Sequence, residues 1–208
     1  KDIAQGNYYI IAVADVTNLI PESNEANNIR SSASSISVWR PDIRIKMVIT
    51  NGNAVTGMNY SVGSVVENNG GITSDTFYVS YYLSTDTTKS SNDRYIGHAT
   101  INGLNGWSTT NAAINCVIPK DIAQGNYYII AVGDVTGLLK ESYETNNIRS
   151  STTRIYVWRP DLRVKAVATS GNTVRGKTGY KVSSVVENNG AVTPNTFYVS
   201  YYLSTDAT

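Results

Sequence analysis

Carboxylate and amide side chains gather in one loop that occurs twice in the chain. The loop follows the apolar run IIAV, and its second occurrence follows the same run 119 residues later. Hard cations such as Ca²⁺ bind six to eight oxygen ligands, which carboxylates and amide carbonyls supply. A calcium site is therefore one interpretation, with one set at Asp15, Asn18, Glu22, Asn24, Glu25, Asn27 and Asn28 and the other at Asp134, Glu141, Glu144, Asn146 and Asn147.

A hairpin whose polar side chains bond to turn amides is the alternative, and it is the favoured one. Asn and Asp side chains commonly accept hydrogen bonds from nearby backbone N–H groups in turns. The spacing of the acidic residues differs from that of an EF-hand loop. Gly137 and Tyr143 also replace Asn18 and Asn24 in the second loop, so the two loops do not share one complete ligand set.

A further acidic pair, Asp86 and Asp93, frames the loop after the run LST, and Asp206 matches Asp86 in a later copy. In a sandwich this loop would lie at the pole where the chain leaves for the next copy. It would then face the acidic and amide side chains of that copy, at Glu187, Asn188 and Asn189. Calcium bound there would stiffen the joint, and ordinary solvated turns are the favoured alternative.

The remaining reactive side chains do not form a catalytic set. His98 is the one histidine and Cys116 the one cysteine, so neither has a partner of its own kind. The sequence has no glycine-rich phosphate loop, no HExxH motif and no cysteine pair. A surface histidine in a strand and a small buried apolar cysteine are the expected roles. We therefore predict that the protein is not an enzyme, and calcium is the one candidate cofactor.

Composition favours a protein outside the cell. Seventeen basic and sixteen acidic side chains give no basic field for nucleic acid. No apolar run is long enough to span a membrane. The chain is rich in Asn, Ser, Thr and Tyr, and it has one Cys and two Met. It starts without Met or a signal peptide, which we interpret as a mature product, an excised piece or part of something longer.

Internal repetition sets the domain organisation. The run DIAQGNYYIIAV occurs at 2–13 and 121–132, and WRPD occurs at 39–42 and 158–161, which gives a period of 119 residues. Such a period indicates tandem domains. We predict the C-terminal part of one copy at 1–39, a complete copy at 40–158 and the N-terminal part of another at 159–208. The last has gained one residue near Gly179, because its later motifs are offset by 120.

Alternating apolar and polar residues predict strands throughout the complete copy. Phe77, Val79, Tyr81 and Leu83 form one face of such a run. Similar runs cover 42–50, 60–68, 112–118, 126–134 and 149–158, and Asn-Gly pairs mark turns between them. About seven short strands in about 100 residues are typical of an immunoglobulin-like β-sandwich.

Several motifs together resemble a known family. In repeat order they are PDIRIKMV, VVENNGG, FYVSYYLSTD, DRYIG, IPKDIAQGNYYIIAVGD and ESNEANNI. These resemble CARDB, the cell-adhesion-related domain of bacterial and archaeal surface proteins. The resemblance spans essentially the whole repeat. It implies tandem immunoglobulin-like domains with an extracellular, non-enzymatic role, and it implies no particular ligand.

The joint between copies has no flexible spacer. IYVWRPDLRV passes from the last strand of one copy to the first strand of the next without Gly or Ser. Proline fixes its own φ and favours an extended preceding residue, so the joint should be stiff. The tryptophans either pack across the joint or complete their own sandwiches. The predicted interface residues are Trp39, Arg40 and Pro41 and their repeats Trp158, Arg159 and Pro160.

Outward tyrosines form a second predicted contact face. Alternation directs Tyr78, Tyr82 and Tyr128 away from the core. Such side chains suit surface glycans or host proteins, because they bury much area at a small entropic cost. High strand propensity is the alternative reason for the many tyrosines.

A stiff surface stalk or filament is the predicted function. The partial copies contain 39 and 49 residues, together 88 of a 119-residue repeat. A head from one molecule and a tail from the next would build most of a composite domain by strand complementation, which would give a homopolymer. The alternatives are a longer polypeptide, an adhesin that binds glycans or proteins, and accessory domains of a secreted hydrolase.

Overall fold

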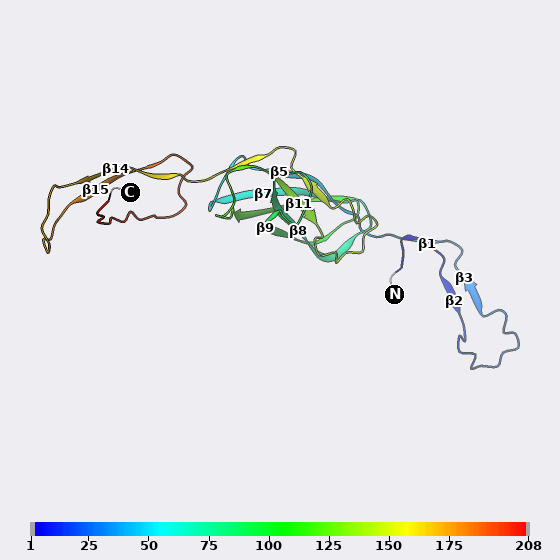
Figure 1. Ribbon diagram of the computed structural model, residues 1–208. Helices are drawn as coiled ribbons and strands as arrows, with labels where there is room; N and C mark the ends of the chain where they lie inside the picture. Colours follow the sequence, from blue (N-terminus) through cyan, green and yellow to red (C-terminus); the bar gives the residue numbers. More distant parts are fainter. Residues whose placement is uncertain (1–2, 207–208) are drawn as a thin grey trace.

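The structure, a computed structural model, describes residues 3–206 and contains only strands joined by turns and loops within that range. A sandwich occupies the middle of the molecule, and pairs of strands extend from its two ends (Figure 1). The all-β prediction is therefore confirmed. Within the described residues there is no helix, and so none that would cross a membrane.

The central sandwich consists of two sheets made by residues 43–158. One sheet has the order β10-β7-β5, and the other has the order β6-β13-β11-β8-β9, with β12 also paired to β11. All pairings are antiparallel except that of β13 with β6. The strands are β5 (Ile43–Thr50), β6 (Ala54–Val55), β7 (Asn59–Asn68), β8 (Thr73–Ser84), β9 (Arg94–Leu104), β10 (Ser108–Val117), β11 (Gly125–Gly133), β12 (Ile148–Ser150) and β13 (Ile155–Trp158).

The alternation predicted for β8 is present in the core. Phe77, Val79, Tyr81 and Leu83 are all buried between the sheets. The Tyr81 hydroxyl lies 2.9 Å from Ser64 Oγ and 2.9 Å from the Ala112 carbonyl oxygen, so it connects β8 to both β7 and β10. A buried hydroxyl needs such partners, because an unsatisfied polar group in the core costs about 1–3 kcal/mol.

The first copy forms two short strand pairs that repeat the geometry of the sandwich. β1 (Gly6–Tyr8) pairs with β4 (Ile36–Val38), and β2 (Ile11–Val13) pairs with β3 (Ile29–Ser31). The register of Ile11 opposite Ser31 is that of Ile130 opposite Ser150 in the complete copy. The sequence alone thus imposes the same local pairing in both copies.

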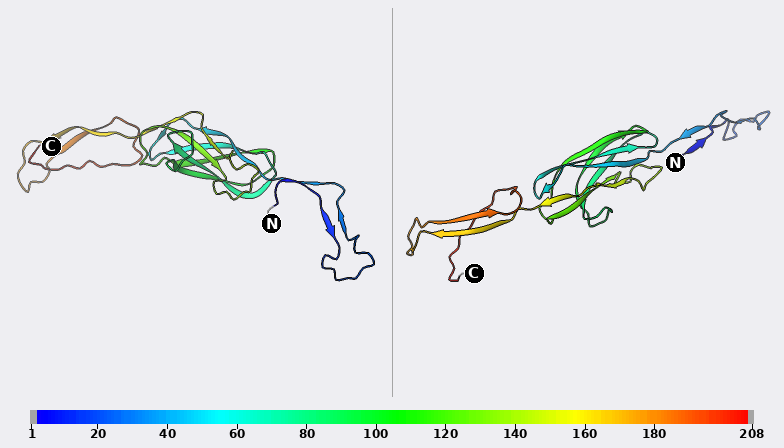
Figure 2. Two further views of the ribbon diagram at one scale, coloured as in Figure 1. Left: turned by 45° about the vertical axis from the view of Figure 1, so that its right-hand side comes forward. Right: turned by 90° about the horizontal axis from the view of Figure 1, so that it is seen from above.

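The last copy forms one long hairpin. β14 (Leu162–Thr169) pairs with β15 (Val182–Asn188), with an irregularity between Val164 and Ala166 that matches the one between Ile45 and Met47. Tyr201 lies 2.8 Å from Ser184 Oγ, which repeats the contact between Tyr81 and Ser64. Two further views place the hairpin and the first-copy strands at opposite ends of the sandwich (Figure 2).

Candidate functional site: the joints between copies

The two joints, 39–42 and 158–161, are held by the same asparagine motif of the following copy. At the first joint, Asn68 Oδ1 accepts hydrogen bonds from the backbone N–H groups of Asp42 and Gly70, each at 3.0 Å, and Asn68 Nδ2 donates to the carbonyl oxygen of Gly71 at 2.7 Å. At the second joint, Asn188 makes the corresponding three bonds at 3.0, 3.1 and 2.6 Å. One side chain thus fixes the start of the following copy.

Backbone hydrogen bonds complete this contact. The N–H of Asn69 donates to the carbonyl of Asp42 at 2.9 Å, and the N–H of Gly71 donates to that of Arg40 at 2.7 Å. At the second joint the equivalent distances are 2.8 and 2.9 Å. A Cβ on Gly70 would lie 2.2 Å from the Arg40 carbonyl oxygen, and one on Gly190 would lie 2.3 Å from that of Arg159. Only glycine allows this approach.

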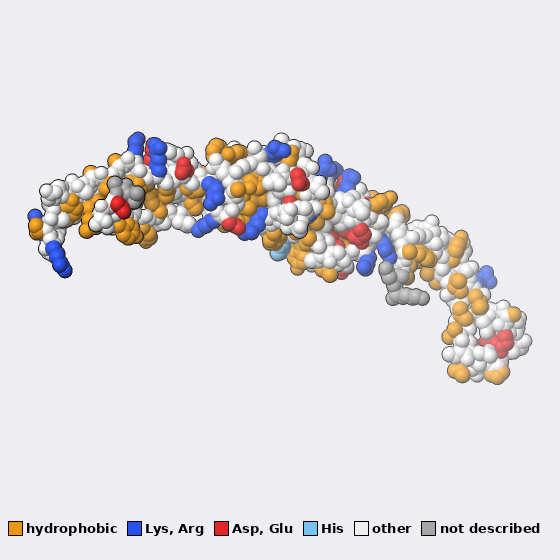
Figure 3. Space-filling model, viewed as in Figure 1, with side chains coloured by type: hydrophobic (Ala, Val, Ile, Leu, Met, Phe, Trp, Pro, Cys, Tyr) orange, Lys and Arg blue, Asp and Glu red, His pale blue; other side chains and the backbone are white. Residues whose placement is uncertain are grey.

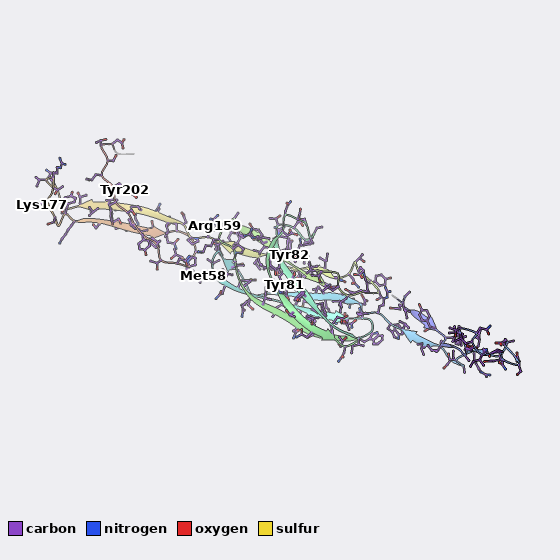
Figure 4. All side chains as sticks on the ribbon, turned by 90° about the horizontal axis from the view of Figure 1, so that it is seen from below. Met58, Tyr81, Tyr82, Arg159, Lys177 and Tyr202 are labelled. Carbon is purple, nitrogen blue, oxygen red and sulfur yellow. The ribbon has the colours of Figure 1, made fainter. Side chains whose placement is uncertain are left out.

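A glutamine of the preceding copy holds each joint from the other side. Gln5 Oε1 accepts a hydrogen bond from the N–H of Arg40 at 3.3 Å, and Gln124 Oε1 accepts one from the N–H of Arg159 at 3.1 Å. Arg159 lies where the sandwich meets the last hairpin, and Lys177 lies at the far tip of that hairpin (Figure 4). Each joint is therefore bonded to the copy before it and to the copy after it.

The two joint tryptophans pack differently, so each of the two alternatives occurs once. Trp39 packs across its joint, in an edge-to-face contact with Trp107 of the following copy at a centroid distance of 5.5 Å. Trp158 packs on Tyr156 of its own copy at 4.4 Å. Tyr156 corresponds to Ser37, and Ala191 corresponds to Gly71, where a Cβ would lie 2.8 Å from Trp39 Cβ. The 208-residue sequence has no second Trp107, so Trp158 has no equivalent ring to pack on across its joint.

The loop at 134–147 also folds onto the first joint. Asn146 Nδ2 donates to Asp42 Oδ1 at 2.8 Å, and the N–H of Ser142 donates to the Pro41 carbonyl at 2.9 Å. The buried Glu141 carboxylate accepts hydrogen bonds from the N–H of Ile43 and from Asn147 Nδ2. The last loop of the copy is therefore bonded to its first strand.

The pKa of Glu141 is raised to about 7, chiefly by burial and also by the negative charges of Glu144 and Asp134, while the hydrogen bonds from Ile43 and Asn147 act to lower it. Desolvation dominates because a carboxylate loses most of its hydration between packed elements. The charge state of Glu141 therefore changes near neutral pH.

The acidic side chains proposed as calcium ligands bond to turn amides. Asp134 accepts from the N–H groups of Leu138 and Leu139 at 3.2 and 2.9 Å, and Asp15 accepts from the equivalent two in the first copy at 3.0 and 2.8 Å. The Glu25 carboxylate accepts a hydrogen bond from the backbone N–H of Glu22, and the Glu144 carboxylate accepts one from that of Glu141. Among residues 3–206, no three His, Cys, Asp or Glu side chains are grouped as metal ligands. A calcium ion at these loops stays a prediction.

Asp86 and Asp93 lie together in the loop between β8 and β9. Asp86 accepts a hydrogen bond from the N–H of Thr88, Asp93 accepts one from that of Ser90, and Lys89 Nζ lies 3.7 Å from Asp93. Glu187 instead pairs with Arg163 and Lys165 of its own hairpin. The two groups of acidic side chains therefore bond within their own copies.

Aromatic side chains cluster on the outer face of the larger sheet. Tyr78 makes an edge contact with His98 at 5.0 Å, and Tyr82 makes one with Tyr95 at 5.6 Å. The Tyr95 hydroxyl lies 2.6 Å from His98 Nδ1, and Lys89 Nζ lies 4.2 Å from the Tyr82 ring centre. We call this cluster the tyrosine face. Ser80, Val135 and Thr136 also line its shallow groove.

Tyr128 and Cys116 lie outside that groove. Arg154 lies over the Tyr128 ring at 5.1 Å. Cys116 is buried, its Sγ donates to the Tyr60 carbonyl at 3.4 Å, and burial raises the pKa of its thiol.

Three contributors to the joints are not predicted from the sequence: Gln5 with its repeat Gln124, the side-chain bonds of Asn68, and Trp107. The signal for the first two was recurrence, since Gln lies within DIAQGNYY and Asn within VVENNG in both copies. Recurrence alone does not distinguish a joint residue from a core or turn residue. Trp107 has no second occurrence in the chain.

The central sandwich places the protein in the class of all-β proteins built on a β-sandwich. The family model of CARDB matches residues 40–151, more than half of the chain. The chain therefore belongs to the CARDB family, which is non-catalytic and adhesion-related. No curated protein matches.

Similar solved structures include two archaeal domains. The CARDB domain of a Pyrococcus furiosus protein, in complex with di-metal ions, is 19% identical over 57% of this chain and 89% of its own, with a TM-score of 0.42. A domain of a presumed cell surface protein from Methanosarcina acetivorans is 18% identical over 57% and 92%, also with a TM-score of 0.42. A β-glucosidase from Erythrobacter marinus is 13% identical over 59% of this chain but 16% of its own, with a TM-score of 0.36.

Proposed function

We propose that this chain is a non-enzymatic structural protein of the cell exterior, in which CARDB copies follow one another as a stiff stalk or filament. The observation that carries the proposal is the repetition of one joint geometry at both joints, with the same asparagine, glycine and glutamine contacts. Membership in an adhesion-related family supports the extracellular location.

The joints would resist bending because the backbone N–H and C=O groups of the joint residues are hydrogen-bonded to the copies on either side. Asp161 donates and accepts hydrogen bonds with the hairpin of the following copy, and Arg159 is bonded to Gln124 of the preceding one. Across the second joint, a Cβ on Gly57 would lie 2.8 Å from Pro194, so the two copies are also in close contact. A change of angle would break several of these bonds together.

Replacing Asn188 by alanine should loosen the second joint. Loss of the side chain exchanges its exposed hydrogen bonds with the N–H groups of Asp161 and Gly190 for bonds to water, at a cost of about 0.5–1.5 kcal/mol. Spin labels on cysteines at the exposed positions Thr100 and Thr173, in a Cys116→Ala background, would measure the distance between the copies. We expect a narrow distance distribution in the parent and a clearly broader one in the variant.

Asn189→Ala is the matched control, because Asn189 serves the joint through its backbone N–H, which alanine retains. Its distribution should stay narrow. A broad distribution in the parent would show that the joint is flexible, and the stiff array would be abandoned. Narrow distributions in both the parent and Asn188→Ala would show that Asn188 does not hold the joint.

The tyrosine face supports a second candidate function, a module that binds surface glycans or host proteins. Its rings flank a groove with hydroxyl, imidazole and ammonium groups at hand, a combination that suits sugar rings. Saturable binding on a glycan array should be lost in Tyr82→Ala and kept in Tyr143→Ala, which removes an exposed loop tyrosine elsewhere. Absence of saturable binding by the parent, or equal loss in both variants, would remove this candidate.

A further inference from the structure

One sequence motif belongs neither to the joints nor to the tyrosine face. Asn59, Tyr60 and Ser61 form the only run of the chain in which Asn stands two residues before Ser or Thr with a residue other than proline between them. In exported proteins this pattern is the acceptor for N-linked glycans, which attach to the Asn side chain at the protein surface. Because the pattern is short, its position in the fold decides whether a glycan fits there.

The motif forms the first three residues of β7, where side chains alternate between the core and the outer face. Tyr60 is buried, and its hydroxyl accepts a hydrogen bond from the N–H of Asn51 and donates one to the carbonyl of Gly52, each at 3.1 Å. Since successive strand residues point to opposite faces, Asn59 and Ser61 lie on the outer face, and both are exposed. The buried tyrosine thus fixes the direction in which the acceptor side chain points.

The Asn59 side chain has room for a bulky substituent. Among residues 3–206, no group is hydrogen-bonded to the side-chain amide of Asn59 or to the hydroxyl of Ser61. The N–H of Thr56 donates to the carbonyl of Trp158 at 3.0 Å, and Met58 follows in the same turn, so the motif begins beside the second joint (Figure 4). A glycan on Asn59 would therefore extend into solvent without breaking a side-chain hydrogen bond of the sandwich.

The last copy shows that the contact of the motif's tyrosine does not depend on its two neighbours. The equivalent residues there are Gly179, Tyr180 and Lys181. The Tyr180 hydroxyl donates to the carbonyl of Gly171, which repeats the bond that Tyr60 makes in the complete copy. The tyrosine is therefore the structural residue of the motif. Asn59 and Ser61 are left for another role.

Exposed apolar side chains share the outer face with the motif. Asn59 lies opposite the exposed Val117 of β10, and Met47 and Ile49 of β5 are exposed on the same face. The space-filling view shows apolar side chains among polar ones on the surface of the sandwich (Figure 3). A hydrated glycan on Asn59 would cover part of this face and so reduce the apolar area in contact with water.

We propose that Asn59 carries an N-linked glycan in the exported protein. This inference goes beyond the stalk or filament function and requires only that the chain leaves the cell. The donor class is a sugar linked through phosphate to a polyprenyl lipid. The new bond joins Asn59 Nδ2 to the anomeric carbon of the sugar. The bond from that carbon to the phosphate oxygen breaks, the lipid phosphate leaves with the electron pair, and the amide nitrogen loses one proton to solvent.

Mass spectrometry of the protein that its source cells export tests this site. Trypsin cleaves after Lys46 and Lys89, so Asn59 falls in the peptide 47–89, which contains no second acceptor motif. We expect this peptide to carry the mass of added sugar residues, and fragmentation by electron transfer should locate them on Asn59. An unmodified peptide would overturn the inference.

Variants produced in the same cells identify the type of modification. Asn59→Gln removes the acceptor and Ser61→Ala removes the hydroxyl that the motif requires, so both should lose the added mass. Ser61→Thr should keep it. Asn115→Gln is the matched control, because Asn115 is an exposed residue opposite Ser61 on β10 but is not followed by the motif. Its added mass should be unchanged.

Added mass that persists in Asn59→Gln or in Ser61→Ala would show that the sugar is not directed by this motif, and so would equal loss from Asn115→Gln. Any of these results overturns the inference. All four substitutions are at exposed positions, so the thermal unfolding midpoint of each variant should stay close to that of the parent without its glycan. The stiff array is tested separately, by the spin-label distances across the second joint.

Discussion

Replacement of Gly70 by alanine should destabilise the central sandwich by about 3 kcal/mol. The new methyl group would lie 2.2 Å from the Arg40 carbonyl oxygen and 2.9 Å from the Asp42 nitrogen, and both of these are backbone atoms. Relief would require the joint to move away from the Asn68 motif and so break its hydrogen bonds. Urea unfolding, followed by the fluorescence of Trp39 and Trp107, would measure the loss.

Gly52→Ala is the appropriate control. Gly52 has a φ of +67° and no atom within 4 Å of its missing Cβ, so the substitution tests backbone conformation without a clash. It should cost about 1 kcal/mol. If the two variants lost equal stability, the close approach at the joint would not be the reason that position 70 requires glycine.

Stability should decrease as the pH rises through 7, because of Glu141. The pKa of Glu141 is about 7 in the folded chain and 4.5 in the reference state, so the folded state binds the proton more tightly. The resulting stabilisation is fully present below pH 4.5 and is lost as the pH rises through about 7. The difference between these two values corresponds to about 3 kcal/mol.

The Glu67 carboxylate has the opposite effect on stability, at lower pH. A hydrogen bond from Lys46, together with the bond and charge of Arg44, lowers the pKa of Glu67 against the effect of burial. Its contribution is lost as the pH falls through that lowered value. Maximum stability is therefore expected between about pH 4 and 6.

Urea unfolding at a series of pH values checks this expectation. Glu141→Gln should abolish most of the dependence of the free energy of unfolding on pH between pH 5 and about 8. The variant should also be less stable at every pH, because the new amide NH₂ would lie near the N–H donors of Ile43 and Asn147. Glu144→Gln, which changes an exposed neighbour, should retain most of the slope. A flat profile in the parent chain would show that Glu141 stays hydrated.

The strands with strict alternation were predictable from the sequence. β7 and β8 follow the expected runs because alternate residues such as Tyr60 and Val62 in β7 and Phe77 and Val79 in β8 are buried in the core. β11 also follows its expected run, although residues 129–133 are buried on both faces of the sheet. β9 was not predicted as a separate run, since Gly97, at a φ of +142°, interrupts its alternation next to a register shift. The run at 149–158 divides into β12 and β13, because a bend between them moves the chain along β11.

The sequence predicts the position of the joints but not the contacts that they make, and the role of the joint residues as an interface stays a prediction. The WRPD joints were located because proline and the lack of a spacer are local features. The bonds from Gln5 and Asn68 to the joint connect residues 35 and 26 positions apart, and no local pattern encodes such distances. The contacts of the acidic loops could not be predicted either. Acidic and amide side chains suit a calcium site, but they equally suit turns in which a carboxylate accepts hydrogen bonds from backbone N–H groups, as Asp134 does in the structure.

The sequence by itself determined the repeat, the strand alternation and the local pairing, because these depend on neighbouring residues and on copies of the same motif. Only the tertiary structure decided which side chains are covered. Identical segments at 122–132 and 3–13 differ in burial, since burial depends on the strands that lie opposite and not on the segment's own residues.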